Sequence, residues 1–213
     1  MNGSAIPFCI LTASGVAAAL VAARADRTLW YAAAKLAASA GFVGVAFTVG
    51  AAHATWSQIV AAGLVLASIG DLVLGARTKR SLPIGMACFA AAYAAYAVGF
   101  TSRGMSIPAA AVGAAVATIV GGTAWVLLYP RVPSILRIPV SIYIAITTIM
   151  LAAGIATGAT RQAWALVAGV VLVALSDGAV GAERFGERSL AIKAVGLPAY
   201  YLGQILIAVS LAG

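Results

Sequence analysis

The sequence predicts an all-α fold, a polytopic transmembrane bundle of eight helices that forms a single integral membrane domain over residues 1–213. Of the 213 residues, 63% are hydrophobic and 8% are charged, which leaves too little polar surface to cover a soluble globule. Apolar runs recur along the chain, and each approaches the ~20 residues that a helix needs to cross a bilayer. These runs are rich in Ala and Leu and lack the apolar and polar alternation of a membrane barrel strand.

Charged or Gly- and Pro-rich breaks divide the chain into eight predicted spans. In chain order, the predicted spans are residues 5–23, 28–50, 58–76, 82–100, 107–129, 138–158, 163–182 and 190–212. The first span has no Lys or Arg before Arg24, so it lacks the basic start of a cleavable secretory signal and is predicted to be a retained helix. The seven connections, at residues 24–27, 51–57, 77–81, 101–106, 130–137, 159–162 and 183–189, are too short for a soluble domain.

The basic residues predict how the spans are oriented. A net charge of +8 would favour nucleic acid binding in a soluble protein, but here nearly all Lys and Arg residues lie between apolar runs. The connections after the first, third, fifth and seventh spans carry ten of them, counting Lys193, and the other three connections carry two. By the positive-inside rule, the four basic connections face the cytoplasm and both termini face away from it. The short connections and high Ala content are typical of a bacterial inner-membrane protein.

A short motif is repeated in the third and seventh spans. Residues 68–77 and 174–183 share a small residue, an Asp, three further residues, then Gly-Ala and a charged residue. The two copies are 106 residues and four spans apart, so they have the same orientation in the membrane. This predicts two four-helix halves related by a pseudo-twofold axis along the membrane normal.

Three charged side chains lie inside the spans: Lys35, Asp71 and Asp177. An ionisable residue at the centre of a membrane helix costs about 2.5 to 3.5 kcal/mol on insertion scales, so such residues usually mark a functional site. Their distances from the basic connections place all three roughly 9 to 12 Å below the cytoplasmic boundary. A purely structural ion pair is the alternative interpretation. Two carboxylates beside one ammonium leave a net negative charge, so one aspartate is expected to hold a proton, and the pair is the predicted catalytic acid and base.

Several uncharged polar side chains accompany these three in the spans. The candidate substrate-binding residues are Lys35, Tyr93, Tyr96, Tyr143, Tyr200, Tyr201, Gln204 and Arg77. For each tyrosine and for the glutamine, hydrogen bonding between helices is the alternative role. The aromatic residues near span ends, Trp30, Tyr31 and Trp56, are predicted to be anchors at the membrane interface.

The sequence also argues against several other chemistries. The sole histidine, His53, lies in a connection on the side opposite both aspartates, so neither a His-based triad nor a histidine metal cluster is expected with them. The chain has no phosphate-binding glycine loop with a following Lys and no dinucleotide fingerprint. We expect no metal, no soluble cofactor and no nucleic acid partner. The expected partners are the lipid bilayer and a lysophospholipid-like substrate.

In their order along eight spans, certain residues resemble the YhhN-like lysoplasmalogenases. They are Lys35, Gly70-Asp71, Tyr143 with Met150, Ser176-Asp177 with Phe185, and Tyr200-Tyr201 with Gln204. The fourth span departs from the pattern, since the family often has a His there, three residues before a Tyr, and this chain has Tyr93 and Tyr96.

The resemblance implies hydrolysis of the vinyl ether bond of lysoplasmalogen, which gives a fatty aldehyde and a glycerophospho-headgroup alcohol. One protonated aspartate would deliver a proton to the vinyl ether carbon, and the other would stabilise the cation and activate water. Lys35, with Arg77, Lys79 or Arg184 at the rim, would bind the lipid phosphate.

Two other functions use the same residues. A proton-coupled transporter of small solutes is also built from repeated halves with carboxylates at their interface, although the aspartates here lie nearer one side than the midplane. In a purely structural membrane protein, Lys35 and the aspartates would form a buried ion network without activity.

Overall fold

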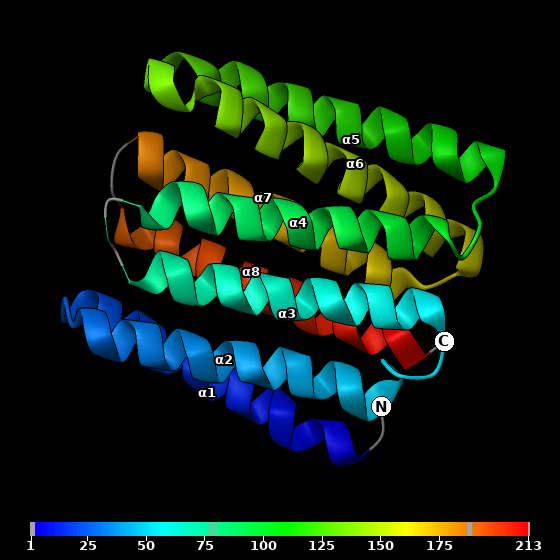
Figure 1. The fold of residues 1–213 in the computed structure, drawn as a ribbon, viewed down its shortest axis with the longest axis horizontal. Helices are drawn as coiled ribbons and strands as arrows, with labels where there is room; N and C mark the ends of the chain where they lie inside the picture. The colour runs from blue at the N-terminus through cyan, green and yellow to red at the C-terminus, as the bar shows by residue number, and fades with distance from the viewer. Residues whose placement is uncertain (1–2, 77, 79, 187–188, 213) are drawn as a thin grey trace.

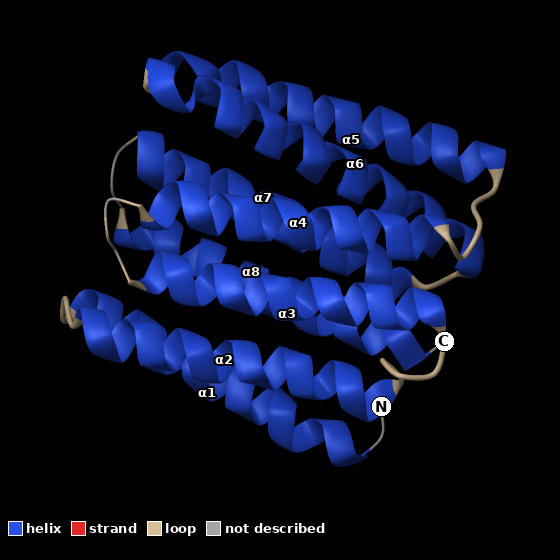
Figure 2. Cartoon of the chain, viewed as in Figure 1, coloured by secondary structure: helices blue, strands red, loops and turns tan. Residues whose placement is uncertain are grey.

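The computed structural model describes residues 3–76, 78, 80–186 and 189–212, which fold into eight long helices and no strand (Figure 2). The long helices are α1 Ile6–Arg24, α2 Thr28–Val49, α3 Thr55–Gly75, α4 Ser81–Thr101, α5 Ile107–Leu128, α6 Arg137–Arg161, α7 Trp164–Phe185 and α8 Leu190–Val209. Four short 3-10 turns, Gly3–Ala5, Tyr129–Arg131, Ser134–Leu136 and Ser210–Ala212, flank them. All eight helices in the described part are long and apolar enough to cross a membrane, so the predicted all-α transmembrane fold is confirmed.

Local sequence signals set where the helices begin and end. Prolines occupy the first turns of α1 and α5, where the missing N–H has no helical partner to lose. The Ser106 hydroxyl caps α5 by accepting a hydrogen bond from the Ala109 N–H at 3.4 Å. Gly50, with a φ of 146°, ends α2 in a conformation that favours glycine. The helix ends differ from the predicted spans by no more than three residues.

Helix α7 continues to Phe185 instead of ending at residue 182. Glu183 and Arg184, predicted to lie in a connection, are therefore in the final helical turn. Both are good helix formers. The last hydrogen bond of the helix is the one that the Gly186 N–H donates to the Ala182 carbonyl oxygen at 2.9 Å. Arg184 also suits this end, since a cation there complements the helix dipole.

The helices form a ring of six with two helices outside it. Helices α2, α3, α4, α6, α7 and α8 contact one another in that order, and α8 closes the ring against α2. Outside the ring, α1 packs on α2 and α8, and α5 packs on α6 and α7 (Figure 1). The connections after α1, α3, α5 and α7, which carry most of the basic residues, lie together at the left end of Figure 1, and both termini lie at the right.

The packing of helices α1 to α4 is repeated by helices α5 to α8. The contacts of α1 with α2, α2 with α3, and α3 with α4 recur between α5 and α6, α6 and α7, and α7 and α8. Close-packing glycines also recur 106 residues apart: a Cβ on Gly63 would lie 2.9 Å from the Ala92 carbonyl oxygen of α4, and a Cβ on Gly169 would lie 2.9 Å from the Gly203 carbonyl oxygen of α8. The arrangement therefore supports the two pseudo-symmetric four-helix halves expected from the repeat.

The glycine contact between α7 and α8 leads to a stability prediction. We expect Gly169→Leu to lower the thermal unfolding midpoint in detergent, because backbone atoms cannot give way and overpacking typically costs about 1–3 kcal/mol. The matched control is Gly122→Leu on the exposed face of α5, where a Cβ would meet no atom within 4 Å. Equal midpoints for the two variants would show that the helices separate here without cost.

Candidate functional site

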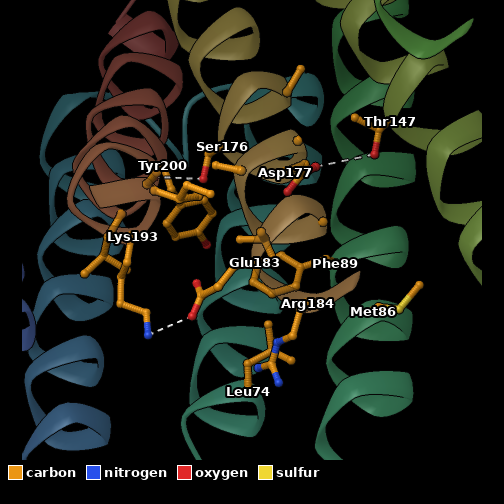
Figure 3. Close-up of a pocket in the computed structure, with 18 of the residues that line it drawn as sticks. Leu74, Met86, Phe89, Thr147, Ser176, Asp177, Glu183, Arg184, Lys193 and Tyr200 are labelled. Atoms are coloured by element: carbon orange, nitrogen blue, oxygen red, sulfur yellow. Dashed lines mark hydrogen bonds and ion pairs between the residues drawn. The ribbon is translucent and has the colours of Figure 1, made fainter. Parts of the chain in front are cut away.

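A cavity of about 750 Å³ lies inside the bundle at the end with the basic connections. All eight helices contribute to its wall, and its volume falls in the roughly 300 to 1,000 Å³ range of small-molecule sites. Figure 3 shows Asp177, Tyr200 and Phe89 around the interior and the charged residues Glu183, Arg184 and Lys193 toward the opening. Both aspartates and Lys35 line this one cavity.

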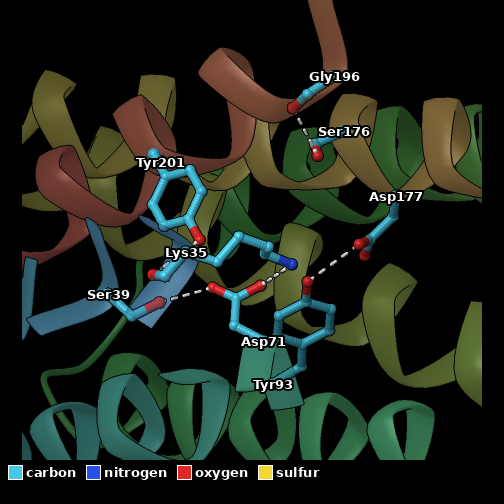
Figure 4. Close-up of polar contacts among 8 residues, drawn as sticks. All are labelled: Lys35, Ser39, Asp71, Tyr93, Ser176, Asp177, Gly196 and Tyr201. Carbon is cyan, nitrogen blue, oxygen red and sulfur yellow. Dashed lines mark hydrogen bonds and ion pairs between the residues drawn. The ribbon is translucent and has the colours of Figure 1, made fainter. Parts of the chain in front are cut away.

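Asp71 on α3 forms an ion pair and a hydrogen bond with side chains of α2. The Lys35 Nζ lies 2.8 Å from Asp71 Oδ1, and the Ser39 hydroxyl donates to Asp71 Oδ2 at 2.8 Å (Figure 4). Lys35 and Ser39 are one turn apart on α2, so both reach the same carboxylate. Asp71 is 2% exposed and Lys35 is 6% exposed, and charges buried to this degree are stable only when they are paired and hydrogen-bonded.

Asp177 on α7 has a different environment. The Tyr93 hydroxyl donates to Asp177 Oδ1 at 3.1 Å, and the Thr147 hydroxyl lies 3.5 Å from Oδ2. Within the described part of the chain, no Lys or Arg forms an ion pair with this carboxyl group. Asp177 is half-buried, and both of these hydrogen-bond partners are uncharged hydroxyls, so its environment differs from that of Asp71 in lacking a counterion among the described residues.

The two aspartate sites are related by the pseudo-twofold axis. Ser39 on α2 and Thr147 on α6 each contact the aspartate of their own half. Lys35 and Tyr143 each lie four residues before that hydroxyl, so the pair on α2 corresponds to the pair on α6. The position that carries the ammonium of Lys35 in the first half thus carries the phenol of Tyr143 in the second. This difference between Lys35 and Tyr143 gives Asp71 a counterion, whereas Asp177 has none from the corresponding position.

Helices α4 and α8 complete the two sites in the same symmetric way. Tyr93 donates to Asp177, and its counterpart 108 residues later, Tyr201, donates to the Lys35 carbonyl oxygen at 3.2 Å. Tyr96 and its counterpart Gln204 meet each other, and the Tyr96 hydroxyl donates to Gln204 Oε1 at 2.7 Å. A buried hydrogen bond between the two halves thus lies where the repeats face each other.

The structure separates the predicted site residues into two groups. Lys35, Asp71, Tyr143, Asp177 and Tyr200 line the cavity. The other four described residues are fully buried behind the cavity wall and hold it through hydrogen bonds: Tyr93, Tyr96, Tyr201 and Gln204. The ring contacts of the tyrosines fill the bundle interior behind the cavity, and a substrate contact of these four residues stays a prediction. Arg77 lies outside the described residues, as does Lys79.

One aromatic residue was assigned to the wrong place by the sequence. Tyr31 is 8% exposed and lines the cavity instead of anchoring the helix at the interface. The Nζ atoms of Lys35 and Lys193 lie 5.9 and 5.7 Å from the centre of its ring, within range of cation–π attraction. Its neighbour Trp30 is 67% exposed, as expected of an anchor, because adjacent helical residues point about 100° apart.

Sequence reasoning also missed three polar contributors to the site. Ser39 and Thr147 resemble ordinary small residues of membrane helices, and only their spacing of 108 residues could have singled them out. Lys193 was counted with the loop charges, but its Nζ pairs with Glu183 Oε1 at 2.8 Å at the cavity opening.

Two buried polar atoms beside the cavity have no hydrogen-bond partner among the described residues: the Tyr200 hydroxyl and Gln204 Nε2. An unsatisfied polar group in a membrane interior costs several kcal/mol, so such atoms favour binding of water or a polar ligand group. His53, in contrast, is exposed in the connection between α2 and α3, at the other end of the bundle.

The geometry supports acid and base chemistry inside a largely apolar cavity. An ionised carboxylate and a carboxyl group without a counterion line the same space, which is the requirement for concerted proton donation and water activation. In comparisons with known proteins, residues 27–211 match the model of the YhhN family. No solved structure matches the chain.

Proposed function

The chain belongs to the YhhN family, and from this premise we propose that it is an intramembrane hydrolase that cleaves the vinyl ether bond of lysoplasmalogen-type lipids. The products are a fatty aldehyde and a glycerophospho-headgroup alcohol. The observation that carries the proposal is the unequal pair of aspartates in one cavity, Asp71 with its Lys35 counterion and Asp177 without one.

In the first step, Asp177 is the acid. Its carboxyl proton moves to the vinyl ether carbon that is not bonded to oxygen, and the electrons of the double bond form the new C–H bond. The neighbouring carbon becomes an oxocarbenium ion, and Asp177 is left as a carboxylate. The nearby negative charge stabilises this cation in a low-dielectric site, where electrostatic contributions are large.

In the second step, Asp71 is the base. It accepts a proton from a water molecule while the water oxygen bonds to the oxocarbenium carbon, which gives a hemiacetal. Collapse of the hemiacetal breaks the C–O bond to the glycerol. The hemiacetal O–H proton returns to Asp177, and the proton on Asp71 passes to the departing glycerol oxygen. Both aspartates regain their starting forms, and one water molecule is consumed.

The charged opening suits the other end of such a lipid. Lys193 and Arg184 line it, and the Lys193 side chain is 19% exposed while paired with Glu183. A phosphate that enters beside this pair gains charge-assisted hydrogen bonds from the cations. With basic connections facing the cytoplasm, as proposed from the loop charges, the substrate would enter from the cytoplasmic leaflet of a bacterial inner membrane.

The test is a lipid screen on the purified protein in D₂O with mass detection of released aldehyde. We expect lysoplasmalogen to give an aldehyde with one deuterium on the carbon next to the carbonyl, because that carbon receives the transferred proton. A saturated alkyl ether of the same length is the control and should stay intact. The proposal fails if no vinyl ether lipid releases aldehyde, and uptake of labelled solute into vesicles without lipid turnover would favour a transporter.

A further inference from the structure

The lining of the cavity is divided by charge. The charged residues that line it come from the α1–α2 connection and from α2, α3, α7 and α8, and are Asp26, Lys35, Asp71, Asp177, Glu183, Arg184 and Lys193. In the described part of the chain, the lining residues of α4, α5 and α6 include none with a charge. Asp177 lies at the border between the two regions, since its hydrogen-bond partners Tyr93 and Thr147 belong to α4 and α6.

Small residues leave space on the uncharged side. Gly178 follows Asp177 and shares a face of α7 with Ala174 and Gly181, at spacings of four and three residues. That face points toward α5, because a Cβ on Gly181 would lie 2.7 Å from Leu128 Cδ1. On α5, Ala124 and Gly121 lie one and two helical turns from Leu128, on the same face of the helix. Both residues line the cavity.

Gly178 faces open space within this region. A Cβ there would meet no atom within 4 Å, whereas one on Gly121 would lie 2.0 Å from Thr148 Oγ1. The uncharged lining continues along α6 from Val140 to Leu151, with the hydroxyl groups of Tyr143, Thr147 and Thr148 between them, over roughly 16 Å at ~1.5 Å per residue. The cavity therefore extends past Asp177, to Leu151, Val120 and Ala174, as an uncharged arm between α5, α6 and α7.

We propose that this arm, lined by Val120, Ala124, Ile144, Leu151, Ala174 and Gly178, is the subsite for the hydrocarbon chain of the substrate, and that Gly178 keeps open the part beside Asp177 through which a chain of any length must pass. The inference rests on the proposed function. The reacting bond of a vinyl ether lipid joins the polar glycerol to the apolar chain, and Asp177 occupies the matching border in the cavity. A headgroup held at the charged opening leaves the chain only the uncharged arm.

The test compares Gly178→Leu with Gly122→Leu in the purified full-length protein. Both substitutions place Leu where a Cβ meets no atom within 4 Å, but Gly178 lines the cavity and Gly122 lies on the exposed face of α5. For Gly178→Leu, we expect kcat/KM for lysoplasmalogen to fall about tenfold or more at every chain length, the usual effect of lost fit in a hydrophobic pocket. Gly122→Leu should match the wild type at every chain length.

An unchanged kcat/KM in Gly178→Leu would overturn the assignment. If Gly178→Leu does not fold, Gly178→Ala makes the same comparison and should lower kcat/KM by a smaller factor. If the wild type releases no aldehyde at any length, the proposed hydrolysis fails first. Binding of saturated alkyl lysophospholipids then tests the arm by itself: Gly178→Leu should weaken this binding and Gly122→Leu should not, and equal binding by the two variants would overturn the assignment.

Discussion

Replacing Asp177 by Asn is expected to abolish aldehyde release while leaving the protein folded. Asn has nearly the same shape and still accepts a hydrogen bond from Tyr93, which donates to Asp177 Oδ1 at 3.1 Å, but an amide cannot donate a proton to carbon. General acid catalysis contributes about 10²- to 10⁴-fold, so we expect kcat to fall by at least the lower figure. The measurement is aldehyde release from lysoplasmalogen, with the thermal unfolding midpoint recorded on the same preparation.

The comparison with Asp71→Asn distinguishes the two aspartates. That variant should also lose activity, but its unfolding midpoint should fall as well, because it leaves the Lys35 ammonium without its carboxylate 2.8 Å away. Asp177 forms no ion pair in the described part of the chain, so its replacement should change stability little. Near-normal turnover in either variant would refute the acid and base pair. Equal losses of stability would refute the difference in charge state.

The positions of Asp71, Asp177 and Lys35 as site residues could be predicted from the sequence, because charged residues are rare within long apolar runs. A charge within a long apolar run is costly, and the basic connections fix the depth of each one relative to the same boundary. Which helices bring these residues together could not be predicted this way. The pairing of Lys35 with Asp71, and not with Asp177, depends on the contact of α2 with α3.

The internal repeat, too, could be predicted from the sequence only in part. Two short motifs around the aspartates were visible in the sequence because an Asp and a Gly-Ala pair recur at the same spacing in both copies. The corresponding pairs on α2 and α6, Lys35 with Tyr143 and Ser39 with Thr147, differ in type, and only the packing of both halves shows that they occupy equivalent positions. Tyr31 was misplaced for a related reason: an aromatic residue near a span end suits the interface and the cavity wall equally well, and helix rotation decides between them.

Replacing Lys35 by Met is expected to cost more stability than any other single change at this site. Lys35 is 6% exposed and pairs with Asp71, which is 2% exposed, and removing one partner of a buried ion pair typically costs about 3 to 5 kcal/mol. Met is unbranched like Lys and only one heavy atom shorter, so the loss reflects mainly the missing charge. The measurement is the thermal unfolding midpoint in detergent, beside the wild type and Gly122→Leu.

The double variant Lys35→Met with Asp71→Asn separates the charge from the fold. It removes both ions, so no unpaired charge stays buried and much of the stability lost in Lys35→Met should return. Activity should not return, because the proposed base is gone. Stability that falls further in the double variant would show that the two residues do not act as a pair. A stable double variant with near-normal aldehyde release would show that the ion pair is purely structural and that the chemistry lies elsewhere in the cavity.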